Sequence, residues 1–527
     1  MASRASAVGT RPRVASPPPT VEVATIAPAR PTRAWVVALA LLGLGAAMLV
    51  AAWVGGNPLG RTPDEPAHVV KALAVGHGEL VGSPATLTGT YSDAQRSWSG
   101  HQTRTFNVPK DVAPSPAFPC PVFNPTVSAG CQRSFPLPSG SRVTTYVGTY
   151  EPYSYAPAGF LMRLGHTRWS AWMLGRIGFA LVSLGLLALA VVALWNDVVP
   201  PLALWGLFLA VTPTVVWLSG SVNPSAAEIT AAICFTSGLL AITRPSPRRR
   251  GSWAALIAGG LVLATTRALG PYFVAAIGLL VLVARGRRVL EAVRREPRLS
   301  VAAAGVVAAG VALNFWWEKR YQPGLHVTPS ALSHWKWERL PSIGREMVGV
   351  FGWLEWHMPN PVFYLWGALF LVLLAAALWR GRWTERLAIV AGVVLTIVVT
   401  LSLHSILPVQ TGYDVYGRYV LPLAVAVPLL ASDVVVRRGR GRARRPLLVI
   451  ATASAVVVLA IQAFAWFVNA RRFAEGTSGP RWFVPHAQWI PSGGWIVWIT
   501  VAMLGVAILA TAATMLGVVT FRRTPAA

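Results

Sequence analysis

Long apolar runs recur along the whole 527-residue chain, and they restrict the folds that are open to it. Many of them reach about 17 to 25 residues, the length that a helix needs to cross roughly 30 Å of hydrocarbon. The chain is 54% hydrophobic and 12% charged, with a mean hydropathy of +0.53, whereas a soluble protein carries about twice that charged fraction. The sequence therefore predicts an all-α polytopic integral membrane protein.

We expect about twelve transmembrane helices. The apolar stretch 252–285 is the hardest to divide, because residues 266–271 (TRALGP) interrupt it. Gly-Pro breaks helices and both flanks are basic, so we interpret it as two short helices that meet on the outer side. The expected spans are 34–54, 172–195, 201–219, 224–243, 252–267, 271–285, 299–317, 361–380, 387–404, 419–436, 446–468 and 494–520.

The net charge of +27 comes largely from short basic segments between the spans. With the spans above, all of these segments fall on one side of the membrane. Lys and Arg are enriched in cytoplasmic loops, so this side is predicted to be cytoplasmic, with both termini inside. The charge needs no nucleic-acid partner. The segments are 244–250, 285–298, 380–386 and 437–445.

The chain divides into one membrane domain and two tails. Residues 1–33 are rich in Ala, Pro, Ser and Arg and lack hydrophobic periodicity, which is typical of a disordered cytoplasmic tail. The single transmembrane domain is expected at 34–520, followed by a cytoplasmic tail at 521–527. Within the domain, 55–168 form a first extracytoplasmic loop that is long enough to be functional. Residues 318–360 form a second external segment.

Two cysteines lie eleven residues apart in the first loop, Cys120 and Cys131, while Cys234 lies within an apolar span. No nearby His completes a zinc pattern around the first two. If the loop faces an oxidising compartment, we expect Cys120 and Cys131 to form a disulfide bond that stiffens it.

The stretch 57–80 (NPLGRTPDEPAHVVKALAVGHGEL) directly follows the first span and predicts a short surface helix. Thr62 and Glu65 have the spacing of a capping box. One interpretation is that Asp64 and Glu65 only cap this helix and favour the positive end of its dipole.

A second interpretation is chemical, and it is compatible with the first. If the helix begins near residue 63, then Asp64, His68 and Lys71 fall at i, i+4 and i+7 and share one face. A carboxylate beside an imidazole at the mouth of a membrane bundle has the groups that a proton-abstracting site needs.

Other ionisable residues gather on the same outer side, and such residues at membrane depth are functional candidates by default. Arg267 separates two apolar runs, and Arg418 directly precedes the tenth expected span. Arginine forks suit phosphate, so these two could hold a phosphate group, although each could instead reach lipid headgroups. The others are Arg163, Arg168, Glu228, His357, His404 and Asp414.

Several motifs together resemble a bacterial membrane-protein family catalogued as domain of unknown function 2142. The resemblance covers about residues 35–470, and its first and last motifs are the most specific in combination. In chain order the motifs are 63–68 (PDEPAH), 76–78 (GHG), 150–152 (YEP), 155–157 (YAP), 221–224 (SVNP), Arg267, 271–272 (PY), 349–353 (GVFGW), 358–359 (MP) and 416–422 (YGRYVLP).

That family is similar to the C-type glycosyltransferases, which use lipid-phosphate-linked sugars as donors. The resemblance implies that Asp64 is the catalytic base or a metal ligand, assisted by Glu65 or His68. It also implies that Arg267 and Arg418 meet the donor phosphate. We add Lys71, Tyr155 and Tyr419 to the substrate-binding candidates. A divalent cation, Mg or Mn, held by Asp64 and Glu65 is a further expectation.

The chain departs from the family pattern at three motif positions. Ser225 stands where the family often carries Asp, Arg267 where Lys is frequent, and Tyr416 where Gln is usual. The change from Lys to Arg keeps the charge. The other two put a specific role for those positions in doubt.

The resemblance implies transfer of a sugar from a polyprenyl-phosphate donor to a cell-envelope glycan or glycolipid, in a bacterial plasma membrane. Membrane lipids would be the other partners. Two alternatives remain open. A transporter or flippase of a lipid-linked intermediate also explains many spans and outer arginines, and it predicts inverted repeats and interrupted helices. A non-catalytic envelope-assembly protein that has kept the fold is the other, because fold alone does not establish activity.

Overall fold

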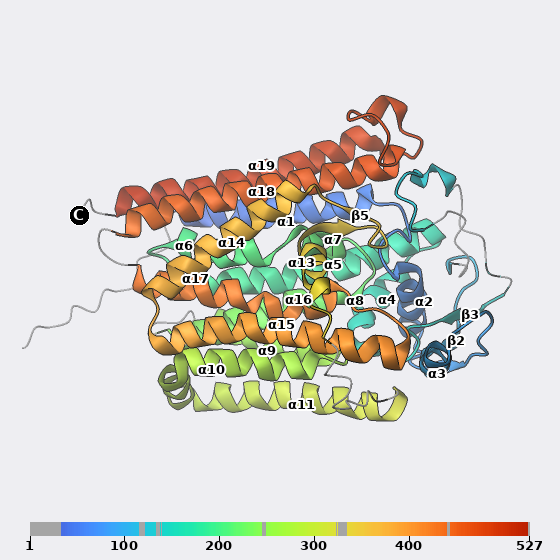
Figure 1. Cartoon of the computed structure of the whole chain (residues 1–527), viewed down its shortest axis with the longest axis horizontal. Coiled ribbons are helices and arrows are strands. Elements are labelled where there is room, and N and C mark those ends of the chain that lie inside the picture. The colour runs from blue at the N-terminus through green and yellow to red at the C-terminus, as the bar shows by residue number, and fades with distance from the viewer. Residues whose placement is uncertain are drawn as a thin grey trace, which may run out of the picture.

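The computed structural model describes residues 33–114, 122–132, 138, 140–244, 249–322, 324, 335–439 and 443–524. Most of the chain is helical, and the longest helices lie side by side along one direction (Figure 1). The helices are α1 (Arg33–Gly56), α2 (Glu65–Gly76), α3 (Asp93–Gln102), α4 (Ala156–Met162), α5 (Arg168–Leu194), α6 (Pro200–Ala210), α7 (Pro213–Ser219), α8 (Pro224–Ile242), α9 (Arg249–Thr266), α10 (Gly270–Arg295), α11 (Pro297–Tyr321), α13 (Leu340–Gly349), α14 (Asn360–Arg380), α15 (Trp383–Thr411), α16 (Gly417–Ala424), α17 (Ala426–Arg438), α18 (Arg444–Glu475) and α19 (Gly494–Arg523).

Each expected span has a helical counterpart among these elements, which confirms an all-α polytopic membrane fold. With α16 and α17 counted together as Gly417–Arg438, nine helices of the described residues are long and apolar enough to cross a membrane, and the pair α6 and α7 would make a tenth, fewer than the twelve expected. That pair is bent by 72°, so the expected span 201–219 is broken rather than continuous. The expected division of 252–285 is also found, because α9 ends at Thr266 and α10 begins at Gly270.

The two ends of the bundle differ in chemistry. We call the end that carries the described part of residues 57–167 the loop end, and it holds α2, α3, β2 and β3 at the right of Figure 1. The opposite end, the basic end, carries the turn between α10 and α11, the residues between α14 and α15, and the C-terminal side of α17. Two buried acids join α10, α15 and α17 there, because Asp433 forms an ion pair with Arg285, and Glu385 forms ion pairs with Arg437 and Arg438.

The first loop is more ordered than its composition indicates. Besides α2, α3 and α4 it contains a three-stranded antiparallel sheet of β1 (Ser83–Pro84), β2 (Arg104–Asn107) and β3 (Arg142–Thr145). Phe106 and Val143 face each other across the sheet and are buried in one apolar cluster with α2. A second, two-stranded sheet of β4 (Val350–Phe351) and β5 (Trp356–His357) lies between α13 and α14.

Helix α2 is buried along its whole length, which places it inside the loop end rather than on its surface. Its last turn packs directly on α4, because a Cβ atom at Gly76 would lie 2.2 Å from the carbonyl oxygen of Gly159. Only glycine permits that approach of two backbones. Helix α8, which is almost completely buried, lies at the centre of the bundle and packs against α5 and α9. These contacts fix the positions of the side chains described next.

Candidate functional site

Asp64 lies at the start of α2 in a left-handed backbone conformation, with φ of 62°. That conformation is uncommon for a residue other than glycine, and such strain concentrates at functional sites. The carboxylate caps no backbone N–H. Instead Oδ1 accepts a hydrogen bond of 2.8 Å from the Tyr146 hydroxyl, and Oδ2 accepts one of 2.6 Å from Nη2 of Arg418. The side chain keeps 25% of its surface exposed, so it remains within reach of a ligand.

The expected capping box is wrong, because α2 begins at Glu65 and neither Thr62 nor Asp64 caps it through a side chain. Glu65 is drawn inward instead. Its carboxylate is fully buried and accepts hydrogen bonds from Arg176 Nε and Nη2, from the N–H of Gly60 and from the N–H of Val222. The two neighbouring acids thus face different surroundings, one open to ligand and one enclosed by donors.

Arg267 and Arg418 meet at one aromatic ring. Their guanidinium carbons lie 4.7 Å and 5.0 Å from the centre of the Tyr419 ring, which is close enough for cation–π attraction. Tyr150 and Tyr416 add a second ring to Arg267 and Arg418, respectively. The rings restrain both guanidinium planes at one place, and Arg418 also holds the carboxylate of Asp64 there.

The two departures at 225 and 267 contact each other. Nη1 of Arg267 donates a hydrogen bond of 2.8 Å to Oγ of Ser225. Serine satisfies one donor without adding a negative charge at that position. Glu228 on α8 interacts electrostatically with Arg267 from the buried side. Three of the residues singled out in the sequence, Ser225, Glu228 and Arg267, therefore form one cluster.

His68 and Tyr155 form a buried pair. Nδ1 of the imidazole lies 2.7 Å from the Tyr155 hydroxyl, and the ring also lies near Tyr150. Burial lowers the pKa of His68, and the charge of Asp64 opposes this effect without reversing it. A neutral imidazole at neutral pH can orient Tyr155, but it carries no positive charge to offer a phosphate.

Lys71 contacts the first loop instead of the cluster around Asp64. Its ammonium group donates to the carbonyl oxygens of Leu80 and Gly148, at 2.5 Å and 2.6 Å, and it lies over the ring of Phe106. Burial lowers the pKa of Lys71. These two short hydrogen bonds to backbone oxygens indicate a structural role, in which Lys71 joins two segments of the first loop. The proposed phosphate role of Lys71 stays a prediction.

The residues do not fit the divalent cation that was expected at Asp64 and Glu65. No group of three or more His, Cys, Asp and Glu side chains able to hold a metal ion occurs among the described residues. The oxygens of Glu65 are already occupied by Arg176 and by backbone donors.

The sequence profile of the family described as "Predicted membrane protein (DUF2142)" matches residues 47–427 of the chain. The chain belongs to this family.

No curated protein matches the chain. Two crystal structures of ArnT from Cupriavidus metallidurans, one in the apo state and one bound to undecaprenyl phosphate, are similar over 93% of this chain and 78% of theirs. The identities are 14% and 15%, and the TM-score is 0.42 in both comparisons. At that score the likeness carries no argument about what this family member does.

The other polar candidates of this DUF2142 protein lie apart from Asp64. Asp414 forms an exposed ion pair with Arg339 at 3.7 Å, and His357 contacts the backbone of the next residue. His404 is buried within α15. Arg163 is exposed, and Arg168 begins α5. Cys120 lies outside the described residues, so its pairing with Cys131 stays a prediction, while Cys234 is free and buried.

Sequence reasoning missed Tyr146 and Arg176. Arg176 lies in the apolar span 172–195, so the rule that ionisable residues at membrane depth are candidates would have found it. Tyr146 has no comparable signal, because it is one of several aromatic residues in a loop. Its contact with Asp64 joins residues 82 positions apart and depends on the pairing of β2 with β3.

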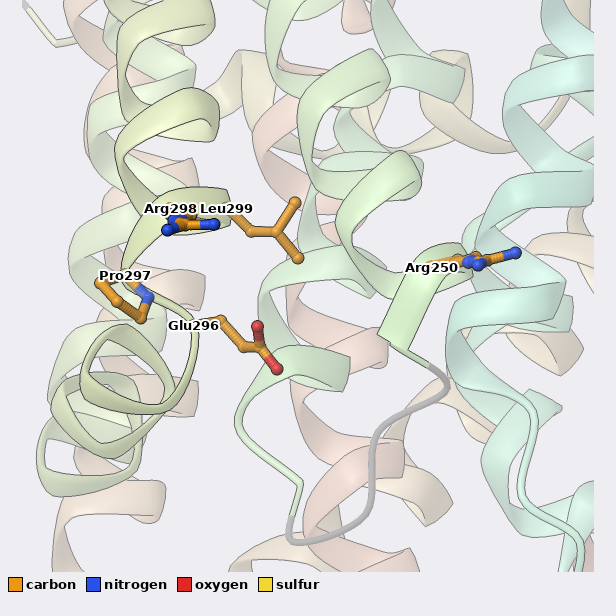
Figure 2. A pocket seen from close by; sticks show the side chains of 5 residues that line it. All are labelled: Arg250, Glu296, Pro297, Arg298 and Leu299. Carbon is orange, nitrogen blue, oxygen red and sulfur yellow. The ribbon is translucent and has the colours of Figure 1, made fainter.

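A recess of about 610 Å³ lies at the basic end of the bundle, opposite the end that carries α2. Figure 2 shows the residues that line it. The recess is open to the outside and is lined by Arg250 on α9, by Glu296, and by the first residues of α11. None of the candidate catalytic or phosphate-binding residues lines it. We therefore place the candidate functional site at the loop end.

Proposed function

We propose that this family member is a membrane glycosyltransferase that moves a sugar from a polyprenyl-phosphate donor to a cell-envelope glycan or glycolipid. The observation that carries the proposal is the position of Asp64, a partly exposed carboxylate that contacts Arg418 at a site shared with Arg267. General-base chemistry needs such a carboxylate within reach of a hydroxyl. Two arginines beside it suit a phosphate leaving group.

In the proposed reaction, Asp64 accepts the proton of an acceptor hydroxyl while that oxygen forms a bond to the anomeric carbon of the donor sugar. The bond between the anomeric carbon and the phosphate oxygen breaks. The polyprenyl phosphate leaves with the electron pair, and Arg418 and Arg267 stabilise the charge that develops on it. Tyr146 holds the carboxylate in position throughout.

We also propose that the loop end is extracytoplasmic, in a bacterial plasma membrane. The distribution of basic residues supports this orientation. The described parts of the four basic segments lie at the opposite end, where the positive-inside rule places the cytoplasm. A donor carried by a membrane lipid reaches a site at the level of the outer headgroups without leaving the bilayer.

The test uses the purified protein in lipid with a panel of radiolabelled polyprenyl-phosphate sugars and an extract of envelope glycans and glycolipids as acceptors. Transfer of label to an acceptor, with release of polyprenyl phosphate, is the expected result. Binding of the donors without transfer or hydrolysis would contradict the proposal.

Transport of a lipid-linked intermediate is the second candidate, because the bent pair α6 and α7 is a broken span of the kind that transporters use. The same panel separates the two functions. A transporter moves the intact donor across a sealed vesicle, whereas a transferase consumes it. Movement of intact donor without any product would favour transport.

Tyr146→Phe is expected to lower the turnover number about 5- to 10-fold and to leave the KM for the donor nearly unchanged. The change keeps the ring but removes the hydroxyl that positions Asp64, a loss of about one hydrogen bond. Steady-state kinetics measures both constants. Tyr413→Phe is the matched control, because it removes a hydroxyl bonded to Ser99 instead. Equal effects of the two variants would contradict a positioning role for Tyr146.

A further inference from the structure

A small recess adjoins Arg418 on the side of α7 and α13. Its lining includes Thr214 and Trp217 from α7, Glu346 from α13, and Tyr416 with Arg418 at the start of α16. Room remains for about one water-sized group, roughly 10 Å³. The recess is thus too small for a sugar ring and has room for a single hydroxyl group.

Two lining residues carry buried nitrogens that have no hydrogen-bond partner within the described part of the chain. These are Nε1 of Trp217, whose residue is 1% exposed, and Nη1 of Arg418, whose residue is 5% exposed. An unsatisfied buried donor is costly, and such groups in native structures call for a partner. Both nitrogens can only donate, so the partner must offer acceptor oxygens.

The recess also supplies acceptors. Oε2 of Glu346 accepts a hydrogen bond of 2.7 Å from the N–H of Gly417, and this carboxyl group lines the same space. Oγ1 of Thr214 donates to the backbone oxygen of Glu346 at 2.9 Å and keeps its lone pairs. The oxygens of a phosphate would face the carboxyl oxygens of Glu346, and neither group would donate a hydrogen bond to the other. A hydroxyl both donates and accepts, so it suits this mixed lining and a phosphate does not.

Arg418 connects the recess to the base. Its Nη2 holds Asp64, and its Nη1 is the free donor described above. A group bound at Nη1 and the carboxylate of Asp64 would therefore be held by the same guanidinium group. The geometry points to a sugar-hydroxyl subsite in this recess, in which Trp217, Glu346 and Arg418 hold one hydroxyl of the donor sugar next to the reacting carbon. This inference rests on the proposed function and adds the residues that select the sugar.

The test compares lipid binding by native mass spectrometry of the full-length protein in nanodiscs. The probes are bare polyprenyl phosphate and polyprenyl-phosphate mannose, glucose, galactose and arabinose. We expect at least one sugar-bearing lipid to bind more tightly than the bare lipid. Trp217→Phe should weaken the binding of that lipid about 3- to 10-fold, and Glu346→Gln should weaken it about 10-fold. Neither change should alter the binding of bare polyprenyl phosphate.

Trp205→Phe is the matched control. Trp205 is equally buried, and its Nε1 also has no partner among the described residues. It lies on α6, outside the recess. Glu346→Gln keeps an oxygen for the Gly417 amide, so the start of α16 is preserved. The subsite is refuted if no sugar improves binding, or if Trp217→Phe matches Trp205→Phe for every lipid.

The outcomes also separate this inference from the proposed function. If radiolabelled sugar is transferred and Trp217→Phe leaves the binding of every donor unchanged, the transferase stands and the subsite is wrong. If the sugar selectively improves binding through Trp217 and Glu346 but no donor is consumed, the subsite stands and the transferase is wrong.

Discussion

Asp64→Asn is expected to reduce sugar transfer about 10²- to 10⁴-fold while the protein stays folded in the membrane. The amide matches the carboxylate in shape and can still accept the hydrogen bond from Tyr146, but it cannot take up a proton at neutral pH. Arg418, whose side chain is only 5% exposed, loses its negatively charged partner, so a lower unfolding temperature is expected beside the loss of transfer. Transfer rates measured at equal protein amounts, with thermal unfolding recorded beside them, give both parts of the result.

Asp414→Asn serves as the control for Asp64→Asn. Asp414 is an acid at the same end of the bundle that pairs with an arginine, but its side chain is 56% exposed and its partner is Arg339 rather than Arg418. We expect it to retain full transfer. A fully active Asp64→Asn variant would exclude Asp64 as the base, and an equal loss in both variants would indicate a general electrostatic effect.

Arg176→Met is expected to destabilise the protein by about 3 to 5 kcal/mol, the usual cost of breaking a buried ion pair by removing one partner. Both Arg176 and Glu65 have fully buried side chains. Arg176 also donates to the backbone oxygens of Val54, Asn57 and Pro58, so the loss would release the turn that connects α1 to α2. Thermal unfolding in lipid or detergent, and the amount of protein in the membrane, measure the effect.

Arg163→Met is the matched control, since Arg163 is exposed at the same end and should change the unfolding temperature little. The double variant Arg176→Met with Glu65→Gln should be less destabilised than the sum of the two single variants, because it leaves no unpaired buried charge. An unchanged unfolding temperature in Arg176→Met would show that this pair does not hold the loop end together.

The separation of Asp64 from Glu65 could not have been read from the motif at 63–68. Adjacent residues at a helix start point in directions set by the backbone, and Asp64 adopts a left-handed conformation that sequence patterns do not predict. The buried Arg176 then forms an ion pair with Glu65, which lies 111 positions away in the chain. Similarly, helical spacing put Lys71 on the face of Asp64, but backbone oxygens at 80 and 148 hold it elsewhere.

The sequence by itself determined the helical membrane fold, the approximate spans and the gathering of the basic segments at one end. These are local properties, since the length of an apolar run and the charge beside it act on each helix separately. It also indicated Asp64, Arg267 and Arg418 as candidates. Only the tertiary structure decided how they meet, because Asp64 and Arg418 are 354 residues apart and come together through the packing of many helices. That packing depends on side-chain shape and hydrogen bonding between distant segments, which no local pattern records.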